Sequence, residues 1–347
     1  MFERLGHLIA RKKKAVLALF LLATVLAGGI GSQVFARFDS GGYSDPKSDS
    51  AQVWDYLDET FKVKDPSVVF VVDAKNKSVD DPAVTATAQE LESQLRAEPS
   101  AESVLSYWSS GGAPSLKSKS GTSALVFVYL KSNDFTEIDK LGGQYQEKYD
   151  GQFKGLNVYA SGGAVFANAI NGRIQDDLKL SETISIPLTF LLLLFVFGAM
   201  AASAMPLIVG ITAILGTFFV MYLLTLITDV SIFALNLTTG LGLGLGIDYA
   251  LLMVNRFREE LARGLDNESA IVNTLRSAGK TVFYSGLTVV LTLISLTFFP
   301  QNFLKSMGYA GAAVVALAVV GALIPLPAIL AILGNKINKG VVRKSGI

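Results

Sequence analysis

Six long apolar runs constrain what this chain can fold into more than any other feature of its sequence. Each run is long enough for an α-helix to cross about 30 Å of hydrocarbon, where a backbone must satisfy its own hydrogen bonds. Hydrophobic residues make up 51% of the 347 residues and charged residues only 17%, which is unusual for a soluble protein. The sequence therefore predicts a polytopic α-helical membrane protein with six transmembrane helices, at residues 15–35, 183–201, 206–227, 232–254, 282–299 and 310–333.

Basic residues predict how these helices are oriented. One basic cluster, Arg11 to Lys14, precedes the first run, a second lies between the fourth and fifth runs, and a third follows the sixth. All three fall on one side if every run crosses the membrane, and the positive-inside rule places that side in the cytoplasm. We therefore expect a multi-pass protein of the inner (plasma) membrane with both termini cytoplasmic. The first run could instead belong to a cleaved signal peptide, but its apolar stretch is long for that role.

The connection between the first two runs is long enough to form a domain, which would lie outside the cytoplasm. β-Branched segments alternate in it with amphipathic ones in the order β-α-β-β-α-β, which predicts an inserted extracytoplasmic α+β domain with a ferredoxin-like fold. The predicted organisation is a basic cytoplasmic segment with transmembrane helix 1 (1–36), the α+β domain (37–180), helices 2–4 (181–255), a cytoplasmic amphipathic helical connection (256–280), helices 5 and 6 (281–335) and a basic cytoplasmic tail (336–347).

Composition excludes several kinds of chemistry. The chain has no cysteine and a single histidine, His7, so thiol catalysis, disulfides and the usual zinc sites are not expected. The formal net charge is +1, which gives no reason to expect a nucleic-acid partner. Gly279-Lys280-Thr281 resembles the end of a phosphate-binding loop, but Thr274 stands where that loop needs a glycine. We expect no metal, no cofactor and no enzymatic activity.

One carboxylate, that of Asp248, lies inside the fourth apolar run. A charged side chain at membrane depth costs roughly 2.5–3.5 kcal/mol on insertion scales, so it rarely persists without a function. On a helix, Asn236, Gly240, Gly244 and Asp248 recur every four residues and form one stripe. Close helix packing explains the glycines, but it does not explain the aspartate. Because burial favours the protonated form of a carboxyl group, we interpret Asp248 as a buried proton carrier.

The fifth run places hydroxyl groups on one helix face, at Thr281, Ser285, Thr288, Thr292 and Ser295. Hydroxyls both donate and accept hydrogen bonds, so this face could hold water and relay protons to Asp248. Alternatively, the hydroxyls bond back to carbonyls of their own helix or join neighbouring helices. A buried aspartate nearby favours the relay. For Tyr249, hydrogen bonding to a partner helix and simple packing both stay open.

The arrangement of one span, a large domain and five more spans resembles the resistance-nodulation-division (RND) superfamily, in particular its MmpL family. The stretch GLGLGIDYALLMVNRFREE at residues 242–260 carries the resemblance. The stretch Phe38-Asp39-Ser40-Gly41-Gly42-Tyr43-Ser44-Asp45-Pro46 is similar to the start of the periplasmic domain in the mycolic-acid transporters of that family. The resemblance covers essentially the whole chain, but only the N-terminal half of a family member.

The resemblance implies roles for individual residues. Family members carry two six-helix halves whose Asp-Tyr pairs face one another as a proton relay. Asp248 and Tyr249 match the first pair, and Ser285 matches a serine beside it, while the second half would come from the same full-length chain or from a second copy. The remaining polar and small residues of both stripes would support the relay or its packing: Asn236, Gly240, Gly244, Thr281, Thr288 and Thr292.

The implied function is export of a long-chain glycolipid, such as trehalose monomycolate, across the inner membrane for cell-envelope assembly, driven by the proton-motive force. The partners would be this lipid, the membrane and the second half, and each half would carry a porter-like domain. Other functions of the superfamily stay open: RND multidrug efflux, a sterol-sensing-like lipid sensor without transport, and an accessory role in protein translocation. A sensor would be indifferent to the proton gradient, whereas efflux would change drug accumulation.

Overall fold

The computed structural model describes residues 1–39, 41–42, 45, 47–61, 64–132 and 134–338. The chain divides into two compact units, a helical unit made of Met1–Asp45 and Leu178–Ile347 and an α/β unit made of Pro46–Asp177. Residues 37–45, which follow the first apolar run, group with the helical unit.

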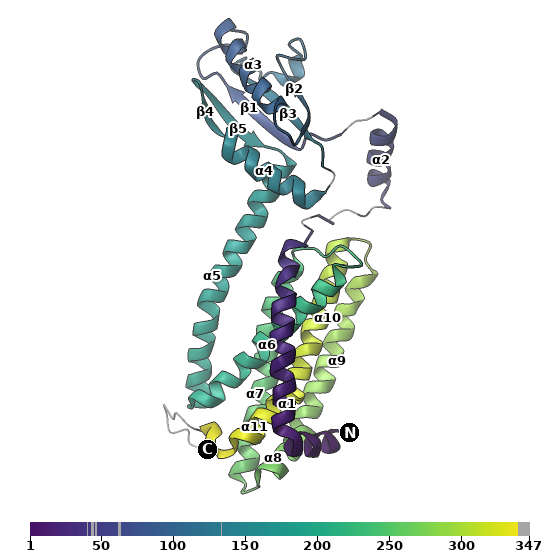
Figure 1. Cartoon of the computed structure of the whole chain (residues 1–347), viewed down its shortest axis with the longest axis vertical. Helices are drawn as coiled ribbons and strands as arrows, with labels where there is room; N and C mark the ends of the chain where they lie inside the picture. The colour runs from purple at the N-terminus through teal and green to yellow at the C-terminus, as the bar shows by residue number, and fades with distance from the viewer. Residues whose placement is uncertain (40, 43–44, 46, 62–63, 133, 339–347) are drawn as a thin grey trace. The chain divides into compact units, whose positions relative to one another are not determined.

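The helical unit consists of long apolar helices (Figure 1). Among the described residues, six helical stretches are long and apolar enough to cross a membrane, and each overlaps one predicted run. The prediction of a polytopic helical membrane protein is therefore confirmed. The helices of these stretches are α1 (Phe2–Gly31, continued by a 3-10 turn over Ser32–Ala36), α5 (Gly163–Phe197), α6 (Met200–Leu224), α7 (Ala234–Ala262), α9 (Lys280–Ile294, continued over Ser295–Phe298) and α10 (Asn302–Leu323).

Local breaks shape these helices. α1 kinks at Lys12, where φ is −104° and ψ is 21°, so residues 2–11 form a separate segment before the apolar run. α10 ends just before Pro325, which begins the short helix α11 (Pro325–Leu333), because proline lacks the N–H that would continue the ladder. Between α7 and α9, the side chain of Asp266 caps α8 (Asn267–Thr274), and one π-helical turn over Leu275–Gly279 leads into α9.

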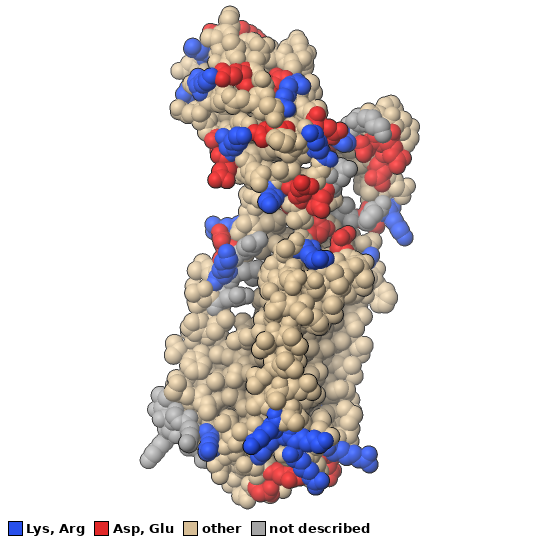
Figure 2. All heavy atoms as spheres, viewed as in Figure 1, with Lys and Arg blue, Asp and Glu red and all other residues tan. Residues whose placement is uncertain are grey.

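Charged side chains have a clear distribution over the helical unit. Figure 2 shows an apolar band along its visible face, with charged residues gathered where α8 and the first residues of α1 lie. The N-terminal segment is tied to α8 there, because His7 Nδ1 and Glu268 Oε1 are 2.9 Å apart. Ile9 of the same segment is fully buried, so the segment packs on the bundle with its apolar side.

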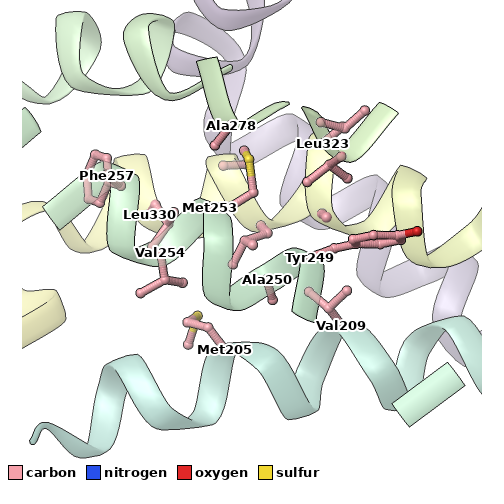
Figure 3. Close-up of a cluster of buried hydrophobic side chains, with 14 of the residues drawn as sticks. Met205, Val209, Tyr249, Ala250, Met253, Val254, Phe257, Ala278, Leu323 and Leu330 are labelled. Atoms are coloured by element: carbon pink, nitrogen blue, oxygen red, sulfur yellow. The ribbon is translucent and has the colours of Figure 1, made fainter. Parts of the chain in front are cut away.

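Glycines let α6 and α7 pack backbone against backbone. A Cβ on Gly246 would lie 2.6 Å from the Cα of Gly210, and a Cβ on Gly242 would lie 2.5 Å from the side chain of Ile214. Both distances are too short for real atoms, so this spacing of the two helices requires glycine. Around the contact, α6, α7 and their neighbours share one apolar core, part of which is drawn in Figure 3.

The chain segment that follows α1 closes one end of the helical unit. The N–H of Asp39 donates to the carbonyl of Val230 (2.9 Å), and the N–H of Ile232 donates to the carbonyl of Asp39 (3.0 Å). Phe38 is buried beside them. Phe38 and Asp39, the first residues of the stretch 38–46 that resembles the mycolic-acid transporters, therefore pack on the turn between α6 and α7. Residues 40, 43, 44 and 46 of that stretch lie outside the described part of the chain.

The α/β unit contains a five-stranded sheet in the order β2-β3-β1-β5-β4, in which every neighbouring pair is antiparallel. β3 lies between β1 and β2, and β1 lies between β3 and β5, so the two β-α-β segments are interleaved (Figure 1). The elements are α2 (Asp49–Phe61), β1 (Val68–Asp73), α3 (Pro82–Arg96), β2 (Ala101–Ser106), β3 (Ser123–Leu130), α4 (Phe135–Tyr149), β4 (Gly151–Phe153) and β5 (Leu156–Ser161).

The core of this unit lies between the sheet and its helices. Phe70 of β1 and Leu91 and Leu95 of α3 are fully buried in one cluster. The sequence pattern missed β4, a three-residue strand that is joined to β5 by Lys154 and Gly155. Both turn residues have positive φ (47° and 95°), which suits a two-residue hairpin. Three residues carry too little alternation to predict a strand.

Candidate functional site

The predicted stripe exists as one exposed face of α7. Asn236, Gly240, Gly244 and Asp248 are all exposed, and a Cβ on either glycine would meet no atom within 4 Å. The stripe lies within a helical stretch that is apolar enough to span a membrane. These four residues, which we call the α7 stripe, therefore form a small and polar surface that the described part of the chain leaves uncovered.

Asp248, which the sequence predicts to be buried at membrane depth, is not covered by the described part of this chain itself. Its side chain is exposed, and its carboxylate makes no hydrogen bond or ion pair within the described residues. The physical reason is the helix period: each residue turns by about 100°, so the face that packs on α6 and α10 leaves the opposite face uncovered. The buried face of α7 includes Gly242, Gly246, Ala250 and Met253.

Tyr249 follows Asp248 on α7 but is turned by about 100° around the helix axis, which brings its side chain into the bundle. It is only 5% exposed and belongs to the core cluster of which Figure 3 shows a part. Its hydroxyl lies 3.6 Å from where a Cβ on Gly286 of α9 would be. Of the two roles that the sequence left open for Tyr249, the structure shows packing in the core. Its hydroxyl oxygen has no hydrogen-bond partner among the described residues.

The hydroxyl face of α9 is exposed, and most of its hydroxyls bond within their own helix. Thr288 Oγ1 donates to the carbonyl of Tyr284 (2.9 Å), and Thr292 Oγ1 donates to that of Thr288 (2.9 Å). Thr281 Oγ1 makes a longer bond of 3.5 Å to the carbonyl of Ser277, and Ser285 is exposed. Bonding to carbonyls of the same helix is the alternative to a proton relay that the sequence left open for these hydroxyls. None of these hydroxyls contacts Asp248 in the described structure, although each can still accept a hydrogen bond.

A buried carboxylate near the C-terminal end of α7, that of Glu260, escaped the sequence reasoning. The side chain of Glu260 is 3% exposed and receives Arg256 Nη2 at 2.5 Å, Arg263 Nη1 at 3.0 Å and Asn273 Nδ2 at 3.2 Å. The network joins the end of α7 to α8. Its sequence signal is the pair of arginines four residues before and three residues after Glu260, spacings that share one helix face.

No metal centre is evident in the part of the chain that the structure describes, because no group of three or more His, Asp or Glu side chains could hold an ion. Polar features of the helical unit include the α7 stripe, the α9 hydroxyls and the Glu260 network. Comparison with protein families matches residues 42–345 to the MMPL family.

The chain belongs to the MMPL family.

Its curated relatives include members of this family from mycobacteria. The trehalose monomycolate exporter MmpL3 of Mycolicibacterium smegmatis is 39% identical over 213 residues, which cover 61% of this chain and 21% of the relative. The MmpL3 of Mycobacterium tuberculosis is 32% identical over 356 residues, 99% of this chain and 37% of the relative. A membrane protein of Streptomyces coelicolor is 35% identical over 352 residues, 99% of this chain and 48% of the relative.

The resemblance to the MmpL family that the sequence suggested is confirmed by these matches. The chain spans less than half the length of these curated relatives. A further relative, the mycolic acid-containing lipids exporter MmpL11 of M. smegmatis, is 27% identical over 343 residues, 97% of this chain and 35% of the relative.

Proposed function

We propose that this MMPL chain forms one half of a proton-driven exporter that moves a long-chain glycolipid, such as trehalose monomycolate, across the inner membrane for envelope assembly. The observation that carries the proposal is the position of Asp248, an acidic residue within a membrane-spanning helix and on a face that the described chain leaves uncovered. The printed names of its relatives, lipid exporters of mycobacteria, point to the class of cargo.

A second six-helix half would cover the α7 stripe. A carboxylate facing lipid is costly, and Gly240 and Gly244 have open space in front of them where another helix could approach closely. The second half would lie in the same full-length chain or in a second copy. At that interface the Asp248 carboxyl would bind a proton from one side of the membrane and release it to the other.

Tyr249 and Ser285 would complete the relay. The Tyr249 hydroxyl is buried without a partner among the described residues, so a water molecule or a group of the second half is expected to bind it. Ser285 is next to Gly286, which the Tyr249 hydroxyl approaches. Each proton that moves down the membrane potential yields about 2.3 kcal/mol per 100 mV, which can drive a conformational cycle.

The α/β unit would be the porter-like domain of this half. Its interleaved antiparallel strands, with β1 and β3 in the centre, support a ferredoxin-like fold to which β4 is added as an edge strand. We place residues 37–180 outside the cytoplasm and both termini inside, because the basic clusters of the helical unit all belong to one side of the six spans.

Asp248→Asn tests the proposal, because asparagine keeps the shape of the side chain but carries no charge. We expect glycolipid export in the native host to fall by roughly 100-fold or more, the usual effect of removing a proton-transfer group. The control is Asp229→Asn, which makes the same chemical change at an exposed residue between α6 and α7. Export that survives Asp248→Asn would rule out the relay, and drug accumulation without a lipid defect would favour multidrug efflux.

A further inference from the structure

Helix α5 is attached to the helical unit at its last turns. Among the described residues of α5 in this unit, the buried side chains are Leu193 (5% exposed) and Phe197 (1%). Residues nearer to its middle, such as Ile184 and Leu188, are more than half exposed. The position of α5 on the bundle is therefore decided by a small contact at its C-terminal end.

A single arginine of α7 makes the polar part of that contact. Arg258 Nη1 donates a hydrogen bond of 3.2 Å to the carbonyl of Phe197, and its guanidinium carbon lies 5.9 Å from the centre of the Phe197 ring. The last carbonyls of a helix have no partner in their own helix and carry the negative end of its dipole, so a cation binds well there. Gly198, with φ of +65°, and one further residue then turn the chain into α6.

The same helix, α7, carries both Arg258 and Asp248. They are ten residues apart, about 15 Å along the helix axis. α5, in turn, runs as one helix, with Pro187 inside it, from Phe197 back to Gly163 in the α/β unit. Any shift or rotation of α7 would therefore move the group that holds the end of α5.

We propose that Arg258 is a positioning residue that transmits movement of α7 to α5, and so couples proton binding at Asp248 to the helix that enters the α/β unit. The inference rests on the proposed function for its proton step. A residue that only capped the end of α5 would affect both fluxes alike when it is removed. If Arg258 couples the two helices, its removal should instead lower lipid export more than proton movement.

The first test compares the two fluxes in proteoliposomes that contain the protein purified from its native host. In Arg258→Met, which keeps a flexible stem but removes the charge and the donors, we expect the ratio of lipid exported to protons moved to fall roughly two- to thirtyfold. Arg258→Lys restores the charge and one donor but not the planar stacking, so it should recover part of the ratio. Arg276→Met is the control, because Arg276 is exposed and its ion pair is with Glu3 of α1 rather than with a residue of α5.

A second test does not depend on transport. The chain has no cysteine, so spin labels at Leu188→Cys on α5 and Leu252→Cys on α7, both exposed, report the distance between the two helices. We expect Arg258→Met to broaden or shift this distance distribution, and Arg276→Met to leave it unchanged.

The outcomes separate the inference from the proposed function. If both fluxes fall together in Arg258→Met at an unchanged ratio, or if its distance distribution coincides with that of the wild type, the coupling role of Arg258 is wrong. If the wild-type protein moves no lipid in response to a proton gradient, the proposed function is wrong, and the distance measurement still decides whether Arg258 holds α5.

Discussion

The backbone contact between α6 and α7 leads to a prediction that can be worked out from distances. In Gly246→Ala, the new Cβ would lie 2.6 Å from the Cα of Gly210 and 2.9 Å from its nitrogen. Both atoms belong to the backbone, so no side-chain rotation can relieve the clash and the two helices must separate. Overpacking of this kind typically costs about 1–3 kcal/mol.

A matched variant on the same helix separates the cost of this backbone clash from the effect of alanine itself. In Gly244→Ala the new Cβ meets no atom within 4 Å. Both variants gain the same helix propensity from alanine, about 1 kcal/mol, so this gain cancels when they are compared. We therefore expect Gly246→Ala to be about 1–3 kcal/mol less stable than Gly244→Ala. Gly210→Ala should fall between them, because its Cβ would lie 3.1 Å from the carbonyl oxygen of Gly242.

The measurement is unfolding of the purified 347-residue chain in detergent micelles by increasing SDS, followed by far-ultraviolet circular dichroism. Equal unfolding midpoints for the two alanine variants would refute the reasoning, since the packed and the open glycine would then be equivalent. The assay also bears on the proposed second half. When that half is present, Gly244→Ala should become harmful, because the open space in front of Gly244 would be filled.

Two further predictions concern charged groups. Lys148 donates a hydrogen bond of 2.5 Å to Glu98, and this bond more than any other cause lowers the pKa of Glu98 below its ordinary 4.5. The stabilisation of the α/β unit by the ionised Glu98 carboxylate should therefore be complete above pH 4.5 and be lost as the pH falls through the lowered pKa. Tryptophan fluorescence can follow this loss, since both tryptophans lie in this unit. In the helical unit, Glu260→Gln should cost about 1–3 kcal/mol in the SDS assay, because its arginine partners lose a buried negative charge. Glu259→Gln, in a more exposed pair, should cost at most about 1 kcal/mol. Equal losses for the two variants would contradict the burial argument.

Much of the fold could be predicted because its signals are local. Each apolar run is a continuous property of neighbouring residues, and all six occur as helices near the expected positions. The start of α8 was predictable for the same reason, since Asp266 caps the first turn that follows it. Elements with weak local signals were missed or misplaced: β4 has three residues, and α1 begins well before its apolar run, at Phe2.

The candidate site was predictable only in part. Helical periodicity placed Asn236, Gly240, Gly244 and Asp248 on one face, which the structure shows. Periodicity does not say whether that face is covered by other helices of the same chain, and the structure shows that Asp248 is left exposed. The contact between Arg258 and Phe197 also lay out of reach, because the two residues are 61 positions apart in the sequence. For Glu260, the two arginine partners are local, but the contact with Asn273 of α8 depends on how α8 folds back on α7.

The sequence by itself determined which segments of this protein are membrane helices, which residues of each helix share a face, and which family the chain resembles. These properties follow from hydropathy and helix geometry, which act over a few turns of one segment. Only the tertiary structure decided which faces meet, with Tyr249 turned into the core, Asp248 left uncovered and the end of α5 bound by Arg258. Contacts between distant segments depend on the packing of several helices at once, and no single segment contains that information.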